Sequence, residues 1–259
     1  MDLQLNGKII VVTGGAKGIG AAIVRACVRE AAVPVFLDRD SAAAEKLQAE
    51  FAGATKCGWL ILDLCSADHC AQAVQQIVRQ FGGIDALVNN AGVNDKVGLG
   101  NGDPVQYAAS LQRNLVHYYS MAHYALPYLK KSKGSIINIG SKTAVTGQGG
   151  TSGYASSKGA ILALTREWAA ELLPYSIRVN AVIPSEVMTP LYRQWLDTFP
   201  KPDEKLKDIL SKIPLEKRMT TAEEIADMVL FLISPRSSHT TGQHLFVDGG
   251  YVHLDRALT

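Results

Sequence analysis

The stretch KIIVVTGGAKGIG, from Lys8 to Gly20, decides the fold of this 259-residue chain. Its first half, residues 8–13, is a short apolar run rich in β-branched side chains, which predicts a buried strand. Glycines follow at positions 14, 15, 18 and 20, and a segment rich in alanine and valine then predicts a helix. A glycine turn placed there lets the backbone approach a pyrophosphate, which then faces the unpaired N–H groups of the helix. A plain tight turn uses the same residues, and the G-x3-G-x-G spacing differs from the G-x-G-x-x-G form. The rest of the chain must therefore decide between a phosphate-binding turn and a plain one.

Strand-like and helix-like segments alternate along the rest of the chain. Further strands are expected at residues 33–38, 58–63, 84–89, 134–140, 177–183 and 244–247, and the clearest helices at 67–81, 154–173 and 221–233. Ser41 is expected to cap a helix that runs to about residue 51. Such alternation predicts a doubly wound parallel sheet whose ligand crevice lies at the carboxyl ends of the strands.

The expected architecture is therefore α/β: one Rossmann domain over residues 1–259, with a single doubly wound parallel sheet of about seven strands. Residues 184–220 interrupt the alternation with five prolines among amphipathic pieces. A long insertion at that end of a sheet usually closes over a ligand, so we expect a small helical lid there.

The composition excludes several classes of protein. Subtracting 24 acidic from 26 basic residues leaves a net charge of +2, which disfavours a nucleic-acid partner. No apolar run approaches the roughly 18 residues of a membrane span, and the first residues do not read as a signal peptide. The cysteines at 27, 57, 65 and 70 form no C-x-x-C pair and are typical of reduced thiols in a cytoplasmic protein. No histidine pair has the spacing of a helical zinc site, so no catalytic metal is expected.

Asp38 ends the second predicted strand, 18 residues after Gly20. An acid near this position hydrogen-bonds the ribose hydroxyls of NAD and repels the 2′-phosphate of NADP. Lys17 and Arg39 are its neighbours, and cations there can pair with a 2′-phosphate instead. The residues therefore favour NAD and leave the use of both cofactors open.

Two more strand ends add candidate cofactor contacts. Asp63 ends the third strand, where its carboxylate can hydrogen-bond an adenine edge. The NNAG segment, residues 89–92, ends the fourth strand, and its small side chains leave room for a flat ring against the backbone. A loop turn explains the same small residues.

Ser141, Tyr154 and Lys158 form the candidate catalytic group. Ser141 follows the fifth strand, and the other two lie four residues apart on the next helix, which places them about 5–6 Å apart on one face. A free tyrosine has a pKa of about 10, so a tyrosine base near pH 7 needs a pKa lower by about 3 units. The lysine ammonium and an oxidised nicotinamide both favour the phenolate. With a serine to donate to the reacting oxygen, the three residues predict a hydride-transfer site without a metal, although an isolated Y-x-x-x-K pattern is common on helix surfaces.

The chain resembles the short-chain dehydrogenase/reductase family along almost its whole length. Seven motifs carry the resemblance in order: TGGAKGIG (13–20), NNAG (89–92), Asn114, Ser141, YASSK (154–158), RVNAVIP (178–184) and VDGG (247–250). The resemblance implies that Tyr154 is the acid/base and that Lys158 lowers its pKa and holds the nicotinamide ribose. It also implies that Ser141 orients the substrate oxygen, that Asn114 holds a water in a proton relay through Lys158, and that the protein is a homotetramer.

By the same resemblance, the cofactor contacts extend from the glycine turn to the lid. The expected residues are Gly14, Lys17, Gly18, Ile19, Gly20, Asp38, Arg39, Asp63, Leu64, Asn90, Ala91, Gly92, Tyr154, Lys158, Pro184, Val187 and Thr189. One departure follows the sixth strand, where the family's Pro-Gly is Pro184-Ser185. Glu186 comes next and puts a carboxylate on the substrate side, although a solvated lid charge explains it as well.

Polar residues crowd the loops expected around the substrate. They are Asn94, Asp95, Ser141, Lys142, Gln148, Tyr154 and Glu186. A steroid or fatty-acyl pocket requires more apolar lining, whereas several hydrogen-bonding side chains suit a polyhydroxylated ligand. Within the family the chain looks most like the bacterial sugar dehydrogenases that oxidise L-fucose. That resemblance implies an NAD(P)-dependent oxidation of a sugar at C1 to the lactone.

Two alternatives stay open. A carbonyl reductase, such as a 3-oxoacyl-carrier-protein reductase, shares every catalytic residue. Asp38 counts against it because biosynthetic reductases usually use NADPH, but Lys17 and Arg39 weaken that argument. A non-catalytic dinucleotide sensor shares the fold, yet such proteins often lose the base or the lysine, and both are present here.

Overall fold

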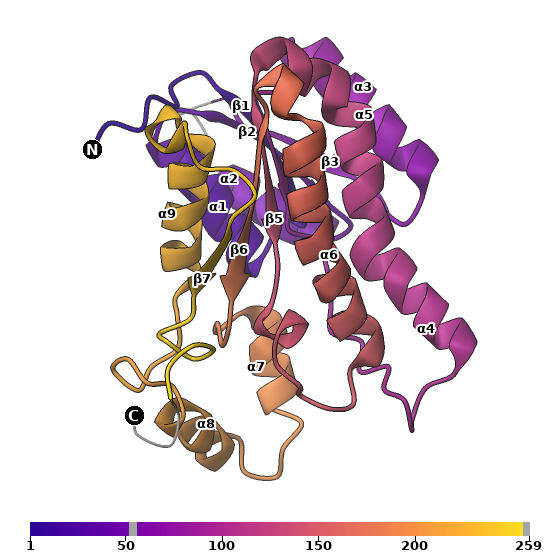
Figure 1. Cartoon of the computed structure of the whole chain (residues 1–259), viewed down its shortest axis with the longest axis vertical. Coiled ribbons are helices and arrows are strands. Elements are labelled where there is room, and N and C mark those ends of the chain that lie inside the picture. The colour runs from indigo at the N-terminus through magenta and orange to yellow at the C-terminus, as the bar shows by residue number, and fades with distance from the viewer. Residues whose placement is uncertain (52–55, 256–259) are drawn as a thin grey trace.

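The computed structural model describes residues 1–51 and 56–255, so the last four residues of the expected domain 1–259 lie outside it. Its centre is one parallel sheet in the order β3-β2-β1-β4-β5-β6-β7 (Figure 1). The strands are β1 (Ile9–Thr13), β2 (Val33–Asp38), β3 (Gly58–Ile61), β4 (Ala86–Asn89), β5 (Ser135–Ile139), β6 (Arg178–Pro184) and β7 (His244–Val247). The chain winds outward in both directions from β1, so the predicted doubly wound Rossmann fold is confirmed.

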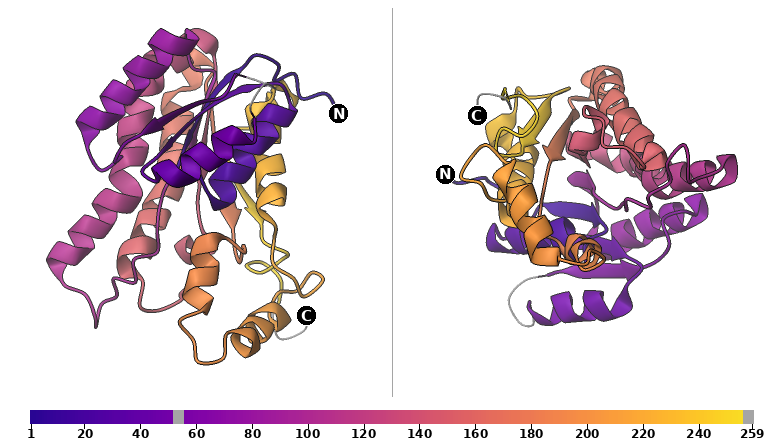
Figure 2. Two further views of the ribbon diagram at one scale, coloured as in Figure 1. Left: turned by 180° about the vertical axis from the view of Figure 1, so that it is seen from behind. Right: turned by 90° about the horizontal axis from the view of Figure 1, so that it is seen from below.

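Helices cover both faces of the sheet (Figure 2). One layer holds α1 (Gly18–Arg29), α2 (Ser41–Ala49) and α9 (Ala222–Ile233). The other holds α3 (Ala67–Phe81), α5 (His117–Ser132) and α6 (Ser152–Glu171), with α4 (Pro104–Leu111) packed on α6. Consecutive residues of β1 are apolar because both of its faces are buried. Ile10 and Val12 pack into the first layer, and Val11 packs into the second.

Local signals set most helix boundaries. Gly82 ends α3 with a left-handed φ of 92°, which glycine adopts without strain. Thr221 and Glu224 form the capping box that the sequence predicts at the start of α9. The expected cap of α2 is wrong by one residue. The side chain of Asp40, not Ser41, accepts the hydrogen bond from the Ala43 N–H at 3.0 Å.

The predicted lid over residues 184–220 contains two helices, α7 (Pro190–Leu196) and α8 (Pro202–Ser211). Both lie beyond the carboxyl ends of the strands (Figure 1). Thr189 starts α7 by accepting the Tyr192 N–H at 3.1 Å. The lid returns to the sheet through a parallel bridge between Val187 and Thr220. It therefore stands over the end of the sheet where the crevice is expected.

Shorter elements complete the chain. A π-helical turn (Gln112–Val116) joins α4 to α5, and 3-10 turns span Lys142–Ala144, Leu173–Tyr175 and Pro235–Ser237. Among the helices of the described residues, none is long and apolar enough to cross a membrane.

The close packing of Gly20 under the glycine turn gives a first prediction. A Cβ at this position would overlap the carbonyl oxygen of Gly14, which the Asn90 side chain holds at 3.0 Å. We expect Gly20→Ala to lower the free energy of unfolding in urea by about 1–3 kcal/mol, because the backbone must shift. At Gly83 a Cβ meets nothing within 4 Å among the described residues, so Gly83→Ala should stay within about 0.5 kcal/mol. Equal stability of the two variants contradicts this packing.

Candidate active site

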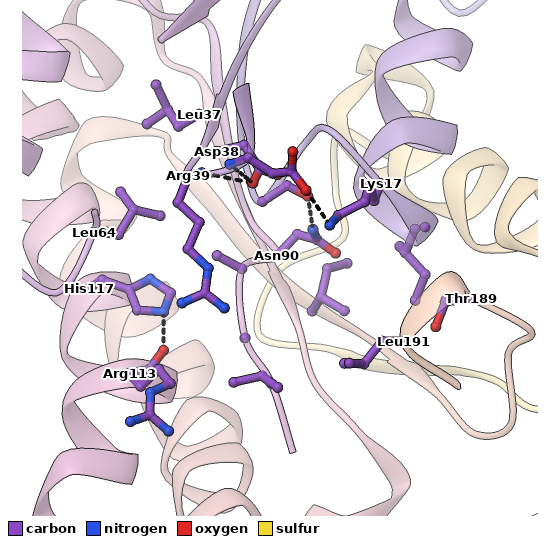
Figure 3. Close-up of a pocket in the computed structure, with 18 of the residues that line it drawn as sticks. Lys17, Leu37, Asp38, Arg39, Leu64, Asn90, Arg113, His117, Thr189 and Leu191 are labelled. Atoms are coloured by element: carbon purple, nitrogen blue, oxygen red, sulfur yellow. Dashed lines mark hydrogen bonds and ion pairs between the residues drawn. The ribbon is translucent and has the colours of Figure 1, made fainter. Parts of the chain in front are cut away.

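A cavity of about 820 Å³ opens at the carboxyl ends of the central strands (Figure 3). Its size lies within the range of about 300–1,000 Å³ that is usual for small-molecule sites. Of the predicted cofactor residues, the lining includes Gly14, Lys17, Gly18, Ile19, Asp38, Arg39, Asp63, Leu64, Asn90, Ala91, Gly92, Tyr154, Lys158, Pro184 and Thr189. The structure thus brings together residues that are up to 175 positions apart, since 189 minus 14 is 175. Gly20 lies beneath the turn, and the Val187 backbone pairs with Thr220.

The glycine turn fits a pyrophosphate. Gly14 and Gly18 have φ values of 63° and 55°, in the left-handed region that favours glycine. A Cβ on Gly14 would lie 2.8 Å from the Ala91 Cα, and one on Gly18 would lie 3.2 Å from a Thr189 methyl group. Within the described chain no side chain caps the N-terminus of α1 at Lys17. The first N–H groups of that helix are therefore available to an anion.

Asp38 holds the turn against β2. Its Oδ2 accepts the Ala16 N–H at 2.9 Å, and its Oδ1 accepts the N–H groups of Arg39 at 2.8 Å and Asp40 at 3.1 Å. A carboxylate has about four lone-pair sites, so a further donor such as a ribose hydroxyl can still bind. Asp38 is placed both to build the cavity and to contact what fills it.

The two cations near Asp38 differ in their surroundings. The Lys17 ammonium pairs with the Asp40 carboxylate at 2.6 Å, and that contact is the first cause that lowers the pKa of Asp40. The Arg39 side chain instead extends into the cavity (Figure 3). Both residues line the cavity, and the Lys17 ammonium is already paired there with a carboxylate.

Thr13 and Asn90 tie the NNAG segment to β1. The Thr13 hydroxyl accepts the N–H groups of Asn90 at 2.9 Å and Ala91 at 3.1 Å. The Asn90 side-chain amide donates to the carbonyl groups of Thr13 and Gly14, both at 3.0 Å. The Asn90 side chain therefore fixes the cavity wall, and the wall presents Ala91 and Gly92 beside it.

Lys158 also lines the cavity and is 2% exposed. Its Nζ donates to the Ile139 carbonyl at 2.7 Å and to the Tyr118 hydroxyl at 3.0 Å, and it lies 5.6 Å from the centre of the Tyr154 ring. Burial lowers the pKa of Lys158 to about 7, because the ammonium loses its hydration.

Burial of Tyr154 acts against its phenolate form. The sequence predicts that the Lys158 ammonium and an oxidised nicotinamide lower its pKa. In the structure burial raises it, and the opposing effect is the hydrogen bond with Ser141. The protein side chains alone therefore do not produce a phenolate at neutral pH. The pKa of Tyr154 depends on the charge state of Lys158 and on what else enters the site.

Ser141 is oriented by a residue that the sequence analysis missed. The Thr143 hydroxyl donates to Ser141 Oγ at 3.0 Å, and the Thr143 N–H approaches the same oxygen at 3.3 Å. With two donors on its oxygen, the Ser141 hydroxyl is left to donate its own hydrogen. Thr143 stands two residues after Ser141, in the 3-10 turn that follows β5, and its nearness to Ser141 was the available signal.

Asn114 is fully buried in the π-helical turn between α4 and α5. Its Oδ1 accepts the Val93 N–H at 2.7 Å, and its Nδ2 donates to the Ser110 carbonyl at 3.1 Å. The side chain holds the loop after NNAG in place. Single π-helical turns are frequent at functional sites, and no period in the sequence indicated this one.

The predicted substrate residues fall into two groups. In the loop after β4, the Asp95 carboxylate accepts hydrogen bonds from the Ser110 hydroxyl at 2.9 Å and the Arg113 guanidinium at 2.8 Å. The Asn94 side-chain oxygen accepts a hydrogen bond from the Lys96 N–H at 3.2 Å. Gln148 is exposed. Beside Ser141, in contrast, the Lys142 ammonium and the Glu186 carboxylate form an ion pair, with 11% and 13% of their side chains exposed.

Several other cavity residues were also missed. They are Arg113, His117, Leu191 and Gln194. Arg113 and His117 flank Asn114 within four positions, so nearness to a motif residue was the signal. Leu191 and Gln194 come from α7 and reach the cavity only because the lid folds over it.

Comparisons with known proteins agree with this geometry. A family model described as enoyl-(acyl carrier protein) reductase matches residues 14–252. An L-fucose dehydrogenase of Bos taurus is 34% identical over 96% of this chain and 91% of its own length. A 3-oxoacyl-[acyl-carrier-protein] reductase of Thermotoga maritima is also 34% identical, over 96% of this chain and 100% of its own length. The solved structure of the Cj0485 dehydrogenase has a TM-score of 0.95 and 46% identity, and covers 100% of this chain and 99% of that one.

His117 makes the stability of this site depend on pH. It is 2% exposed, its Nε2 donates to the Arg113 carbonyl at 3.0 Å, and its Nδ1 has no hydrogen-bond partner among the described residues. Burial, with a smaller contribution from Lys158, lowers its pKa from 6.5 to about 4. Between these values the unfolded chain binds a proton that the folded chain does not, so stability falls as the pH drops through this window.

Between pH 6.5 and pH 4.5, we expect the free energy of unfolding of the wild type to fall by about 2–3 kcal/mol more than that of His117→Gln. Urea unfolding at several pH values measures it. His123 is exposed on the same helix, so His123→Gln should keep the wild-type slope. Identical slopes in all three proteins would show that His117 is protonated in the fold.

Proposed function

The chain belongs to the short-chain dehydrogenase/reductase family of oxidoreductases, and on this premise we propose that it oxidises an aldose, L-fucose or a close relative, at C1 to the lactone. One observation carries the proposal. Tyr154 and Lys158 line a cavity of dinucleotide size, Ser141 hydrogen-bonds Tyr154, and Lys142, the residue after Ser141, forms a buried ion pair with Glu186. Hydride-transfer groups thus stand beside groups that can hydrogen-bond several hydroxyls.

A nicotinamide dinucleotide bound along the cavity supplies the hydride acceptor. The glycine turn and the start of α1 would hold its phosphates, Asp38 its adenosine ribose, and Lys158 its nicotinamide ribose. Tyr154 Oη takes the proton of the C1 hydroxyl while the C1–H bond breaks and the C=O bond forms. Ser141 donates a hydrogen bond to the same oxygen, and the Lys158 ammonium stabilises the phenolate form of Tyr154.

NAD is the favoured cofactor in this proposal. Asp38 places a carboxylate at the end of β2, and Asp40 already neutralises Lys17. Arg39 extends into the cavity and supports some use of NADP. We also propose that the protein works in the cytoplasm as a homotetramer, as the family resemblance implies. Exposed apolar side chains on the α4–α5 segment, Val105, Val116 and Tyr119, are consistent with such contacts.

The sugar is favoured over a fatty-acyl substrate by the charges around Ser141. Glu186 accepts a hydrogen bond from Tyr192 of α7, a contact that also raises the pKa of Tyr192, and the Lys142 Nζ lies 4.0 Å from the Tyr251 ring centre. Desolvating two charges costs energy that their attraction rarely exceeds. A pair kept there is better explained by recognition of polar substrate groups than by stability.

A carbonyl reductase acting on oxoacyl thioesters remains the second candidate. It is favoured by the T. maritima relative, which matches this chain at the same identity as the fucose dehydrogenase. The catalytic residues serve both reactions, so only substrate turnover separates the two.

The proposal is tested by following formation of reduced nicotinamide with a panel of aldoses, each with NAD and with NADP. We expect L-fucose and its stereochemical relatives to be oxidised, with NAD preferred. Tyr154→Phe should lower the rate at least about 100-fold while NAD still binds, because it removes only the proton acceptor. No sugar turnover by a protein shown to bind the cofactor, with reduction of oxoacyl thioesters instead, would establish the second candidate.

The role of the buried ion pair is tested by removing both charges together. A single substitution would leave one buried charge unpaired at a cost of about 3–5 kcal/mol, so the double variant Lys142→Met/Glu186→Gln is the informative one. We expect its kcat/KM for the preferred sugar to fall at least about tenfold, and its preference over a deoxy analogue of that sugar to shrink, because a hydroxyl loses its partners. Binding of NAD should not change.

The exposed ion pair Lys201–Glu204 on the lid offers a matched control. Lys201→Met/Glu204→Gln should leave kcat/KM and sugar preference as in the wild type. Loss of NAD binding in the Lys142→Met/Glu186→Gln variant would instead show that the ion pair holds the lid over the cofactor cavity.

A further inference from the structure

A second buried tyrosine contacts the proposed catalytic lysine. Tyr118 lies in the first turn of α5 and is 0% exposed. Its hydroxyl accepts a hydrogen bond from Lys158 Nζ at 3.0 Å and donates to the Ile139 carbonyl at 3.1 Å. The same carbonyl accepts Lys158 Nζ at 2.7 Å. The three groups therefore close a triangle of hydrogen bonds at the carboxyl end of β5.

This geometry excludes Tyr118 as an alternative base. Its hydrogen is committed to Ile139, and its side chain is sealed from solvent. Burial raises its pKa well above the usual value, and nearby Tyr154 adds to the rise, so the phenol stays neutral. What it offers to Lys158 is a neutral oxygen that accepts a hydrogen bond.

The ammonium of Lys158 has three hydrogens. One is directed to Ile139 and one to Tyr118, which leaves one for the cavity that Lys158 lines. While both hydrogen bonds hold, the direction of the third N–H group of the ammonium is fixed. Without the Tyr118 oxygen, a buried ammonium would have one acceptor from the protein instead of two.

We propose that Tyr118 is a positioning residue, whose hydroxyl fixes Lys158 Nζ beside Tyr154 and preserves its ammonium form. The inference rests on the proposed roles of Tyr154 and Lys158. Tyr118 contacts neither substrate nor cofactor in this assignment, and acts through the lysine.

Three titratable side chains of the described residues face Lys158 and can influence its pKa. Tyr154 faces it from its own helix, and Tyr118 and His117 face it from α5. Asp63 acts on His117 from the loop after β3, and Ile139 of β5 contributes its carbonyl. His117 is neutral near pH 7 because burial lowers its pKa to about 4. Burial disfavours the ammonium of Lys158, and the two hydrogen-bond acceptors oppose that effect.

The direct test is a pH titration of the Lys158 side chain by NMR in protein labelled with 13C at the lysine ε carbon. The resonance is assigned by its absence in Lys158→Arg. We expect its midpoint to fall by about one pH unit in Tyr118→Phe, since the ammonium loses one acceptor. Tyr119→Phe is the matched control, because Tyr119 is the next residue and is 56% exposed. It should titrate as the wild type.

Turnover gives a second readout. In Tyr118→Phe the ammonium is lost at lower pH, so Tyr154 ionises less readily and the rising limb of the oxidation rate should move to higher pH. On that limb the rate should fall about tenfold, because one pH unit is a factor of ten in the phenolate population. The plateau at high pH should stay near the wild-type rate. A purely structural role would instead lower the rate equally at every pH.

If Tyr118→Phe does not fold, 3-fluorotyrosine at position 118 replaces it. The fluorine weakens the oxygen as an acceptor and keeps the hydroxyl, so a smaller shift in the same direction is expected. An unchanged Lys158 midpoint in the folded variant overturns the inference, whatever the substrate proves to be. Failure of the sugar assay alone overturns the proposed substrate and leaves the NMR result to decide the role of Tyr118.

Discussion

The site depends on the hydrogen bonds that hold the glycine turn to the strands around it. Asp38 accepts an N–H group of the turn, and the Asn90 side chain holds two of its carbonyls. These bonds join the ends of β1, β2 and β4, which lie next to one another only because the sheet is doubly wound. The turn can then keep its left-handed glycines and direct the start of α1 at the cavity. The contacts proposed for the phosphates and the adenosine ribose of a dinucleotide follow from that arrangement.

Burial is the second constraint, and it acts against the chemistry. Lys158 and Tyr154 are removed from water, which favours the neutral form of each. Neutral side chains would make a poor proton-transfer pair. The hydrogen bonds around them oppose that effect: Ser141 acts on the tyrosine, and Ile139 and Tyr118 act on the lysine. The low dielectric that penalises these charges also strengthens the interaction between them once they form.

The proposed substrate end is built by segments far apart in the chain. Lys142 comes from the loop after β5, Glu186 from the loop after β6, Tyr192 from α7 and Tyr251 from the C-terminal segment. Loops vary more than the elements that they connect, so these segments are where relatives with the same fold can differ. The polar character of this cluster, more than the fold, favours a hydroxylated substrate.

The sequence alone determined the strands, the glycine turn and the catalytic helix, because each depends on contacts within a few residues. Apolar runs bounded by turns predicted every strand, and the four-residue spacing of Tyr154 and Lys158 placed both on one helical face. Only the tertiary structure decided that Lys142 pairs with Glu186, 44 residues away, and that Tyr118 contacts Lys158, 40 residues away. It also decided how deeply Tyr154 is buried, and that burial raises its pKa. Burial and long-range pairing arise when the layers close over the sheet, and no local pattern of residues records them.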